Sequence, residues 1–374
     1  MVCPAPPHVE QGRGEGRRFD SGRGLVQFLL WSIAAWSSAA AWGAPDAADE
    51  SVFPGDHWAC RTPEQLGLSR EKLDALRDLV GGRGCVVRHG YMAYAWGDQH
   101  KSADVASAMK PVISTLMLMA VQDKSIADVD EPLARFEPRL RALNGGKDAS
   151  ITWRHLASQT SGYGLAERPG EAWAYNDFAL ALYYDTLMDK VYRRPGTAVL
   201  RERIAGPLQF EDEVTFEAFG PNDRKGRLAD SVRDFARFGL LWLRGGRWGE
   251  QQLLDGGLVK TALSTPVSSV LPRTRRKEAA MLPGQRSVGG TRDITPVGPG
   301  YYSFNWWTNG KDNQGRRLFV DAPPDAYVAS GHGGPHVLCI VPSLDLIVSW
   351  NESGIDDHDA SPATGGRSAT WPPV

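Results

Sequence analysis

The mostly apolar run 112–121 constrains the fold of this 374-residue chain more than any other segment. Pro111 stands directly before it, in the first turn of the predicted helix, where a missing backbone N–H does no harm. Ser107 and Lys110 lie three residues apart at the start of the same helix, so they share one of its faces. The segment therefore predicts a helix over 107–122 that carries a hydroxyl and an amine side by side near its N-terminus.

This pair has the residue types that nucleophilic catalysis needs, because an amine beside a serine can take the proton of its hydroxyl. The helix dipole and the free N–H groups of a helix N-terminus also favour a developing negative charge at Ser107. The spacing alone is a weak signal. Ser69 and Lys72 have the same spacing at the start of an amphipathic segment, where Ser69 is expected to act only as an N-cap.

Two later segments carry polar residues at characteristic spacings: Tyr175-Asn176-Asp177, shortly after Pro169-Gly170, and His332-Gly333-Gly334. Together with Ser107-x-x-Lys110, they resemble the serine beta-lactamase, penicillin-binding protein and related esterase superfamily, closest to its class C-like serine hydrolase branch. In that superfamily the motifs are Ser-x-x-Lys, Tyr-x-Asn, and Lys-Thr-Gly or His-x-Gly on a strand beside the site. The resemblance covers the chain from about Trp58 to Asn351.

The resemblance implies that Ser107 is the nucleophile and that Lys110 or Tyr175 is the base. Either burial neutralises the lysine, or its charge favours the tyrosinate form of Tyr175, and the sequence leaves both alternatives open. A nearby Asp177 would hold Lys110 charged and so favour Tyr175. His332 would donate a hydrogen bond to Tyr175 or to a substrate carboxylate.

The sequence departs from the family pattern at two positions. Asp177 stands where the second motif carries Asn, and an ionised carboxylate cannot donate to a substrate carbonyl as an amide does. Pro335 stands where the family has an N–H that completes the oxyanion hole, and proline has none. We expect a bulge after Gly334 that lets the N–H of His336 supply this donor.

The resemblance also implies an α+β fold, in which an antiparallel sheet is flanked by helices and joined to an all-helical lobe. Within a hydrolase domain over 44–353, the α/β lobe is expected at about 58–106 and 295–353 and the helical lobe at about 107–294. A polar tail follows over 354–374.

Periodicity and turn residues locate the individual elements. Helices are predicted at 69–80, 107–122, 151–159, 176–193, 197–205 and 231–244. A hairpin is predicted at 84–98, and strands at 301–308, 317–320, 327–330, 337–341 and 346–350. The Gly- and Pro-rich segment 272–300 is either a disordered insert or a lid over the cleft.

Residues 1–43 resemble an export signal. Arginines precede the apolar stretch 25–36, the small residues 37–41 follow it, and cleavage is expected after Gly43. An uncleaved anchor stays open, because apolar and small residues run over 25–44, about the ~20 residues that span a bilayer. We expect a periplasmic or secreted protein, attached to a membrane only if the leader is retained.

The net charge of −2 and the pI near 6.5 give no basic footprint for nucleic acid. No CxxC motif and no histidine pair at helical spacing indicates a metal site, and no cofactor is expected. Cys339 is expected to be a buried hydrophobic residue, whereas Cys60 and Cys85 flank the first helix and could form a disulfide across it.

The sequence thus predicts an exported serine hydrolase that forms an acyl-enzyme on Ser107 and hydrolyses a small ester or amide. Two alternatives stay open. The first is a D-alanyl peptidase or beta-lactamase that acts on cell-wall peptides or lactams. The second is a catalytically silent protein that binds a cell-wall peptide in the same cleft.

Overall fold

The computed structural model describes residues 52–217, 225–290, 292–293, 295 and 297–354. The expected leader and the tail beyond residue 354 lie outside these residues. Within the described part of the chain, no helix has the length and apolar character required to cross a membrane.

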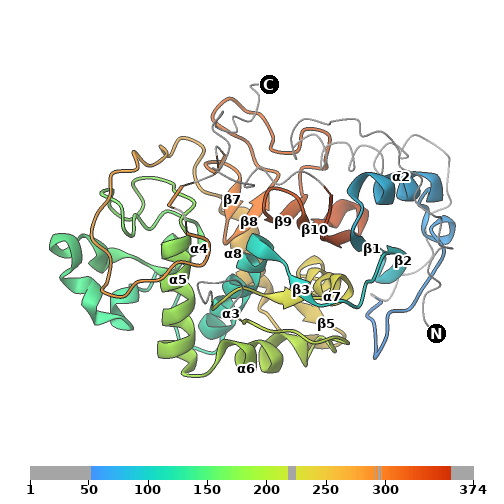
Figure 1. Ribbon diagram of the computed structural model, residues 1–374, viewed down its shortest axis with the longest axis horizontal. Coiled ribbons are helices and arrows are strands. Elements are labelled where there is room, and N and C mark those ends of the chain that lie inside the picture. The colour runs from blue at the N-terminus through green and yellow to red at the C-terminus, as the bar shows by residue number, and fades with distance from the viewer. Residues whose placement is uncertain (1–51, 218–224, 291, 294, 296, 355–374) are drawn as a thin grey trace.

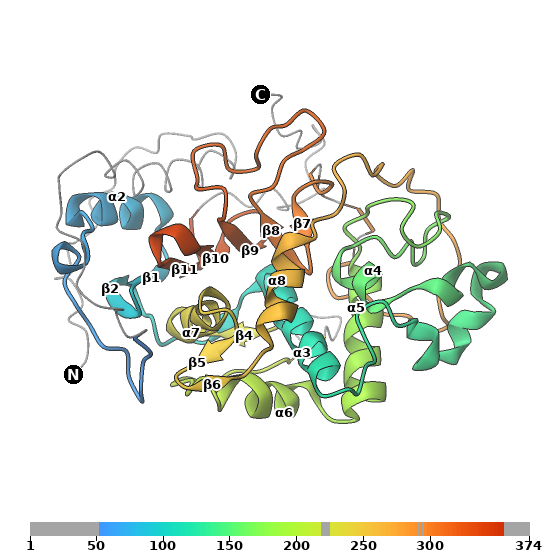
Figure 2. The same ribbon diagram turned by 180° about the vertical axis from the view of Figure 1, so that it is seen from behind.

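One antiparallel sheet of seven strands organises the fold, with the order β2-β1-β11-β10-β9-β8-β7 (Figures 1 and 2). The N-terminal hairpin pairs with the last strand, so that Arg83 stands opposite Asn351. The strands are β1 (Arg83–Arg88), β2 (Tyr91–Trp96), β7 (Tyr302–Ser303), β8 (Trp306–Thr308), β9 (Tyr327–Gly331), β10 (His336–Val341) and β11 (Leu346–Asn351). Two short pairs lie apart from this sheet: β3 (Ala103–Asp104) with β4 (Ala229–Asp230), and β5 (Arg247–Trp248) with β6 (Gln251–Gln252).

Alternating side chains of the sheet pack into two separate hydrophobic layers, as the period of two along a strand requires. In β10, Val337 and Cys339 face the layer that contains α2 (Arg70–Val80), whereas Leu338 and Ile340 face the layer that contains α7 (Val232–Leu243). Figure 1 shows these two helices on opposite faces of the sheet. The predicted α+β fold is therefore confirmed.

The helices have local causes in the sequence. Ser69 caps α2 by accepting a hydrogen bond from the backbone N–H of Lys72, and Ser231 caps α7 through the N–H of Asp234. The remaining helices are α3 (Lys110–Gln122), α4 (Trp153–Ala157), α5 (Asp177–Thr186), α6 (Gly196–Leu200) and α8 (Gly256–Ser264). Shorter 3-10 or π segments are η1 (Glu64–Leu66), η2 (Ala106–Met109), η3 (Leu133–Arg135), η4 (Pro138–Arg141), η5 (Leu143–Ser150), η6 (Leu187–Tyr192), η7 (Arg201–Ala205) and η8 (Pro342–Leu344).

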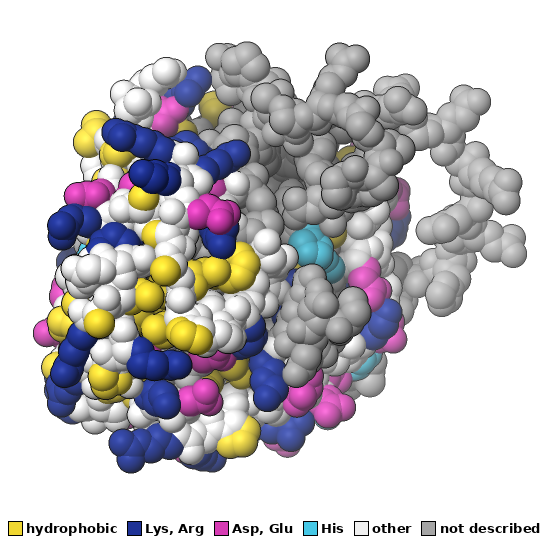
Figure 3. All heavy atoms as spheres, turned by 60° about the vertical axis from the view of Figure 1, so that its left-hand side comes forward, with side chains coloured by type: hydrophobic (Ala, Val, Ile, Leu, Met, Phe, Trp, Pro, Cys, Tyr) yellow, Lys and Arg dark blue, Asp and Glu magenta, His cyan; other side chains and the backbone are white. Residues whose placement is uncertain are grey.

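Helices α3 to α6 gather beside one end of the sheet and form the helical lobe (Figure 1). Helix α7 falls within the range expected for this lobe, yet it packs against β1, β10 and β11. On the face of the lobe seen in Figure 3, basic and acidic side chains are interspersed.

Two predicted strands differ from the structure, and one helix of the structure was not predicted. The strand expected at 301–308 is the hairpin β7–β8, because Phe304 and Asn305 both adopt positive φ and reverse the chain. The strand expected at 317–320 is absent, since the side chain of Asn309 bonds both the N–H and the C=O of Phe319 in place of a neighbouring strand. Helix α8 was not predicted from the sequence.

The possible disulfide between Cys60 and Cys85 is excluded, because Cys85 is a free thiol. Its side chain is fully buried in β1 and donates to the carbonyl oxygen of Val232 across 3.4 Å. Cys339 is also free and buried, as expected from its apolar strand.

The described part of the loop 272–300 is bound to the helical lobe. Backbone hydrogen bonds join Trp173 to Pro272 and Thr274, and others join Gly164 and Ala166 to 277–279. These hydrogen bonds favour the interpretation of this loop as a lid over the cleft, and they argue against a disordered insert.

Candidate active site

Ser107 lies in the turn η2, which leads directly into α3. Lys110 Nζ donates a hydrogen bond to Ser107 Oγ across 2.7 Å. The Lys110 side chain is only 2% exposed. The structure therefore brings together the two side chains whose spacing placed them on one face of the helix.

The end of β9 presses against the turn that carries Ser107. Gly331 has no side chain, and a Cβ placed there would lie 2.6 Å from the carbonyl oxygen of Val105 and 2.9 Å from Ala106 Cβ. Contacts this close exclude any larger residue at position 331. The backbone of the third motif is thereby held next to the nucleophile.

Tyr175 and Asp177 are positioned by the start of α5. The buried side chain of Asn176 between them caps the helix by accepting from the N–H groups of Phe178 and Ala179, and it donates to the carbonyl oxygen of Tyr163. This cap fixes the position of Tyr175, whose ring centroid lies 4.4 Å from Lys110 Nζ. The second motif thus meets the first around the lysine.

Asp177 faces the same amine. Its Oδ1 lies 3.4 Å from Lys110 Nζ, and both side chains are buried. The covering loop closes over this carboxylate: Val288 donates to the carbonyl oxygen of Asp177, and a Cβ at Gly289 would lie 2.0 Å from Asp177 Oδ2. Asp177 is therefore enclosed between the lysine and the loop.

Aromatic rings form a wall beside Tyr175. Trp307 stacks on the Tyr175 ring with centroids 6.0 Å apart, and Tyr302 and Trp173 meet the same ring at 6.2 and 6.3 Å. Trp306 stands next to Trp307 in β8. Trp306 instead packs in the core against Trp242 and Tyr327.

His332, Gly333, Gly334 and Pro335 form the turn between β9 and β10. The β9–β10 register runs from the pair His336 and Gly331 to the pair Ile340 and Tyr327 without a shift, so the expected bulge is absent. The turn closes through the N–H of Gly334, which donates to the carbonyl oxygen of Gly331. Pro335 lies within this four-residue turn, so its missing N–H does not interrupt the pairing of β9 with β10.

His336 opens β10, and its Nδ1 is bonded to Asn351 Oδ1 in β11. Burial lowers the pKa of His336 below its ordinary value, so the neutral ring is favoured. The rings of His332 and His336 meet edge to face at 5.4 Å. The His336 side chain is thus directed at Asn351.

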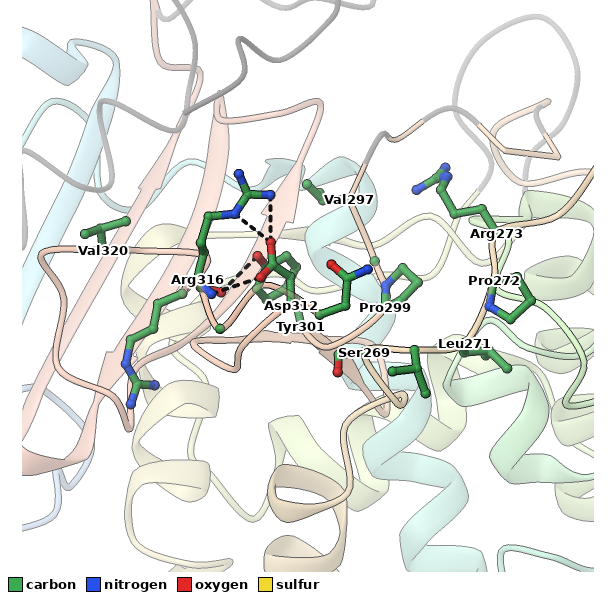
Figure 4. Close-up of a pocket in the computed structure, with 15 residues that line it drawn as sticks. Ser269, Leu271, Pro272, Arg273, Val297, Pro299, Tyr301, Asp312, Arg316 and Val320 are labelled. Atoms are coloured by element: carbon green, nitrogen blue, oxygen red, sulfur yellow. Dashed lines mark hydrogen bonds and ion pairs between the residues drawn. The ribbon is translucent and has the colours of Figure 1, made fainter.

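A cavity of about 740 Å³ is lined by residues from the segments 269–273, 297–301 and 312–320 (Figure 4). Gly298 lines this cavity and packs on the indole of Trp173, and an ion pair between Asp312 and Arg316 crosses it. Val270 and Val320, exposed by 77% and 53%, also line it. The catalytic candidates Ser107, Lys110 and Tyr175 are not among its lining residues.

Sequence reasoning missed Asp104 and Arg227, which form an ion pair beside the nucleophile turn. Asp104 stands three residues before Ser107, but its partner is 123 residues further along the chain. No pattern within a short stretch of sequence predicts an ion pair between residues so far apart. Tyr302 was missed because it was read as one residue of a continuous strand.

A family model described as beta-lactamase matches residues 70–354. Among solved structures, a penicillin-binding protein homologue from Caulobacter crescentus aligns with a TM-score of 0.54 at 15% identity, over 82% of this chain and 94% of that one. EstCE1, described as a hydrolase with promiscuous acyltransferase activity, aligns with a TM-score of 0.53 at 15% identity, over 76% and 92% of the two chains.

The octameric penicillin-binding protein homologue from Pyrococcus abyssi aligns with a TM-score of 0.51 at 13% identity, over 79% of this chain and 74% of that one. At such identities these likenesses show the fold alone. No protein of curated function matches the sequence. Because the family model spans most of the chain, including every motif described above, this chain belongs to the beta-lactamase family.

Proposed function

We propose that this protein is an exported serine hydrolase that forms an acyl-enzyme on Ser107 and hydrolyses a small ester or amide. The contact between Lys110 Nζ and Ser107 Oγ carries the proposal, since it sets a buried amine in direct hydrogen-bond contact with the hydroxyl of a potential nucleophile. A protein that only binds a cell-wall peptide has no need of this buried pair.

In the proposed reaction Ser107 Oγ attacks the substrate carbonyl carbon and its proton passes to a base. The leaving alcohol or amine departs with a proton, and water then hydrolyses the acyl-enzyme and restores the serine. Because Asp177 faces Lys110, we assign the lysine as a cation. Tyr175, whose ring centroid lies 4.4 Å from Lys110 Nζ, is the group that we assign as the base.

The developing oxyanion needs two donors. The N–H of Ser107 belongs to the first turn of η2, where backbone N–H groups have no acceptor within the helix. We assign the second donor to the N–H of His332 rather than that of His336, because the close contact of Gly331 with Val105 and Ala106 sets the end of β9 beside the nucleophile.

The surroundings of the site favour particular substrates. Asp177 offsets the positive charge of Lys110, so a substrate carboxylate is attracted less strongly than at a site with a neutral amide. The ring of Trp307, stacked on that of Tyr175, offers an apolar wall for an acyl group. Short-chain esters and amine-bearing amides are therefore preferred to penicillins and cephalosporins.

The proposal is tested by hydrolysis of p-nitrophenyl esters with the wild-type protein, Ser107→Ala and Ser69→Ala. Ser69 is a matched control, because it has the same Ser-x-x-Lys spacing but caps α2. Ser107→Ala should lose roughly 10⁴-fold or more in kcat, while Ser69→Ala should keep its activity and lose about 1 kcal/mol of stability. Equal activity in Ser107→Ala and the wild type would exclude the assignment.

A further inference from the structure

The residue directly before the nucleophile has an unfavourable backbone conformation. Ala106 adopts a φ of 50°, in the left-handed region that residues with a Cβ avoid. Its side chain is fully buried. Such conformations persist only where the surrounding contacts impose them. Contacts from other residues must therefore keep the turn that carries Ser107 in this conformation.

Asp104 supplies the contact that holds the turn. Its Oδ1 accepts a hydrogen bond from the backbone N–H of Ala106 across 2.8 Å. Arg227 grips the same carboxylate with two donors: Nε donates to Oδ1 across 3.1 Å, and Nη2 donates to Oδ2. Arg227 is 7% exposed, whereas the Asp104 side chain is 26% exposed, so water reaches this two-point ion pair only from the side of Asp104.

The backbone of Asp104 is fixed by two other elements. It pairs with Ala229 in the β3–β4 ladder, and the following N–H, that of Val105, donates to the carbonyl oxygen of Leu228 across 3.0 Å. Asn351 Nδ2 donates to the Asp104 carbonyl oxygen across 3.3 Å. The Asp104 carboxylate that binds the Ala106 N–H is therefore held on a fixed stretch of backbone.

We propose that Asp104 and Arg227 form a clasp that imposes the left-handed conformation of Ala106 and thereby aims Ser107. Both are positioning residues, and the inference rests on the proposed function of Ser107. Without the Asp104 acceptor, the Ala106 N–H is left without this partner and the turn relaxes toward negative φ. Rotation of the next peptide then moves the Ser107 N–H and hydroxyl away from Lys110.

The test compares kcat and KM for a p-nitrophenyl ester, together with the rate of Ser107 labelling by a fluorophosphonate. Asp104→Ala should lower kcat and the labelling rate about 100-fold, the cost of a misplacement near 1 Å, with KM little changed. Asp104→Asn keeps an oxygen acceptor for the Ala106 N–H and should stay within about tenfold of the wild type.

A second substitution separates positioning from a loss of stability. Glycine adopts positive φ without strain, so Ala106→Gly in the Asp104→Ala background should restore activity by about tenfold or more. Asp345→Ala is the matched control, since it removes a carboxylate that Arg244 grips at 2.6 and 3.1 Å in the turn before β11. That variant should lose thermal stability with an unchanged kcat.

A labelling rate in Asp104→Ala equal to that of the wild type overturns the clasp, as does a loss that Ala106→Gly leaves unrestored. If the wild-type protein is not labelled at all, the proposed function fails. The clasp is then decided by the crystal structure of Asp104→Ala: an Ala106 φ still near 50° overturns it, and a negative φ supports it.

Discussion

Asp177 places a carboxylate 3.4 Å from Lys110 Nζ, where the Tyr-x-Asn motif would place a neutral amide. An amide can donate to a substrate carbonyl, whereas the carboxylate can only accept. The carboxylate also offsets the charge of Lys110, which weakens the attraction of the site for a substrate carboxylate. The selectivity of the enzyme should therefore depend on this residue.

Asp177→Asn should raise kcat/KM for a chromogenic cephalosporin relative to p-nitrophenyl acetate by about tenfold, since it removes the charge and restores an amide donor. Asp185→Asn provides the control, because Asp185 lies on the same helix and pairs with Arg286 outside the site. A native enzyme that already hydrolyses lactams as its best substrates would contradict this reading of Asp177.

Local sequence is enough to predict the Ser107–Lys110 contact, because helix geometry sets the distance between residues three apart. It is not enough for Asp104, whose partner Arg227 is brought near only by the β3–β4 pairing. The proposed donor role of His336 rested on a bulge that the regular β9–β10 register excludes.

At the scale of elements, the site depends on how closely β9 approaches η2. Gly331→Ala should abolish most of the activity, because the new Cβ would lie 2.6 Å from the Val105 carbonyl oxygen and push the strand away from the nucleophile turn. Gly55→Ala is the control, since a Cβ there meets nothing within 4 Å. Full activity in Gly331→Ala, measured as ester hydrolysis, would show that this approach is unnecessary.

The contact between His336 at the start of β10 and Asn351 at the end of β11 should make the stability of the protein depend on pH. Burial lowers the pKa of His336 from 6.5, so the unfolded chain takes up a proton at a higher pH than the folded one. The contribution of His336 to the free energy of unfolding is fully present above about pH 6.5. It is lost as the pH falls toward the pKa of His336 in the folded protein. The His332 ring and Arg227 oppose its protonation, whereas Asn351 and Asp104 favour it.

His336→Gln should therefore lose less stability than the wild type when pH drops from 7.5 to 5.5. The measurement is the denaturant midpoint of both proteins at the two pH values. Identical changes in the two midpoints would show that His336 is not buried in its neutral form.

The elements that sequence patterns locate well are those with a long period or a clear cap, such as α2, α7, β10 and β11. The hairpin β7–β8 escaped prediction because Phe304 and Asn305 reverse the chain without the usual turn glycine. The segment 317–320 carries buried apolar residues, but an asparagine side chain satisfies Phe319 where a strand would.

At the scale of the whole molecule, the site is assembled from distant parts of the chain. Ser107 and Lys110 come from η2 and α3, Tyr175 and Asp177 from the start of α5, and the third motif from the turn after β9. The sheet places β9 against η2, and the covering loop closes over Asp177. The resemblance predicted this architecture, whereas the packing of the loop and of the aromatic wall required the structure.

The proposed function requires Ser107 to be an activated nucleophile. The most direct measurement is intact-mass spectrometry after incubation with a fluorophosphonate, followed by peptide mapping of the adduct. We expect one adduct, on Ser107, in the wild-type protein and in Ser69→Ala, and none in Ser107→Ala. An unlabelled wild type, or an adduct that persists in Ser107→Ala, would contradict it.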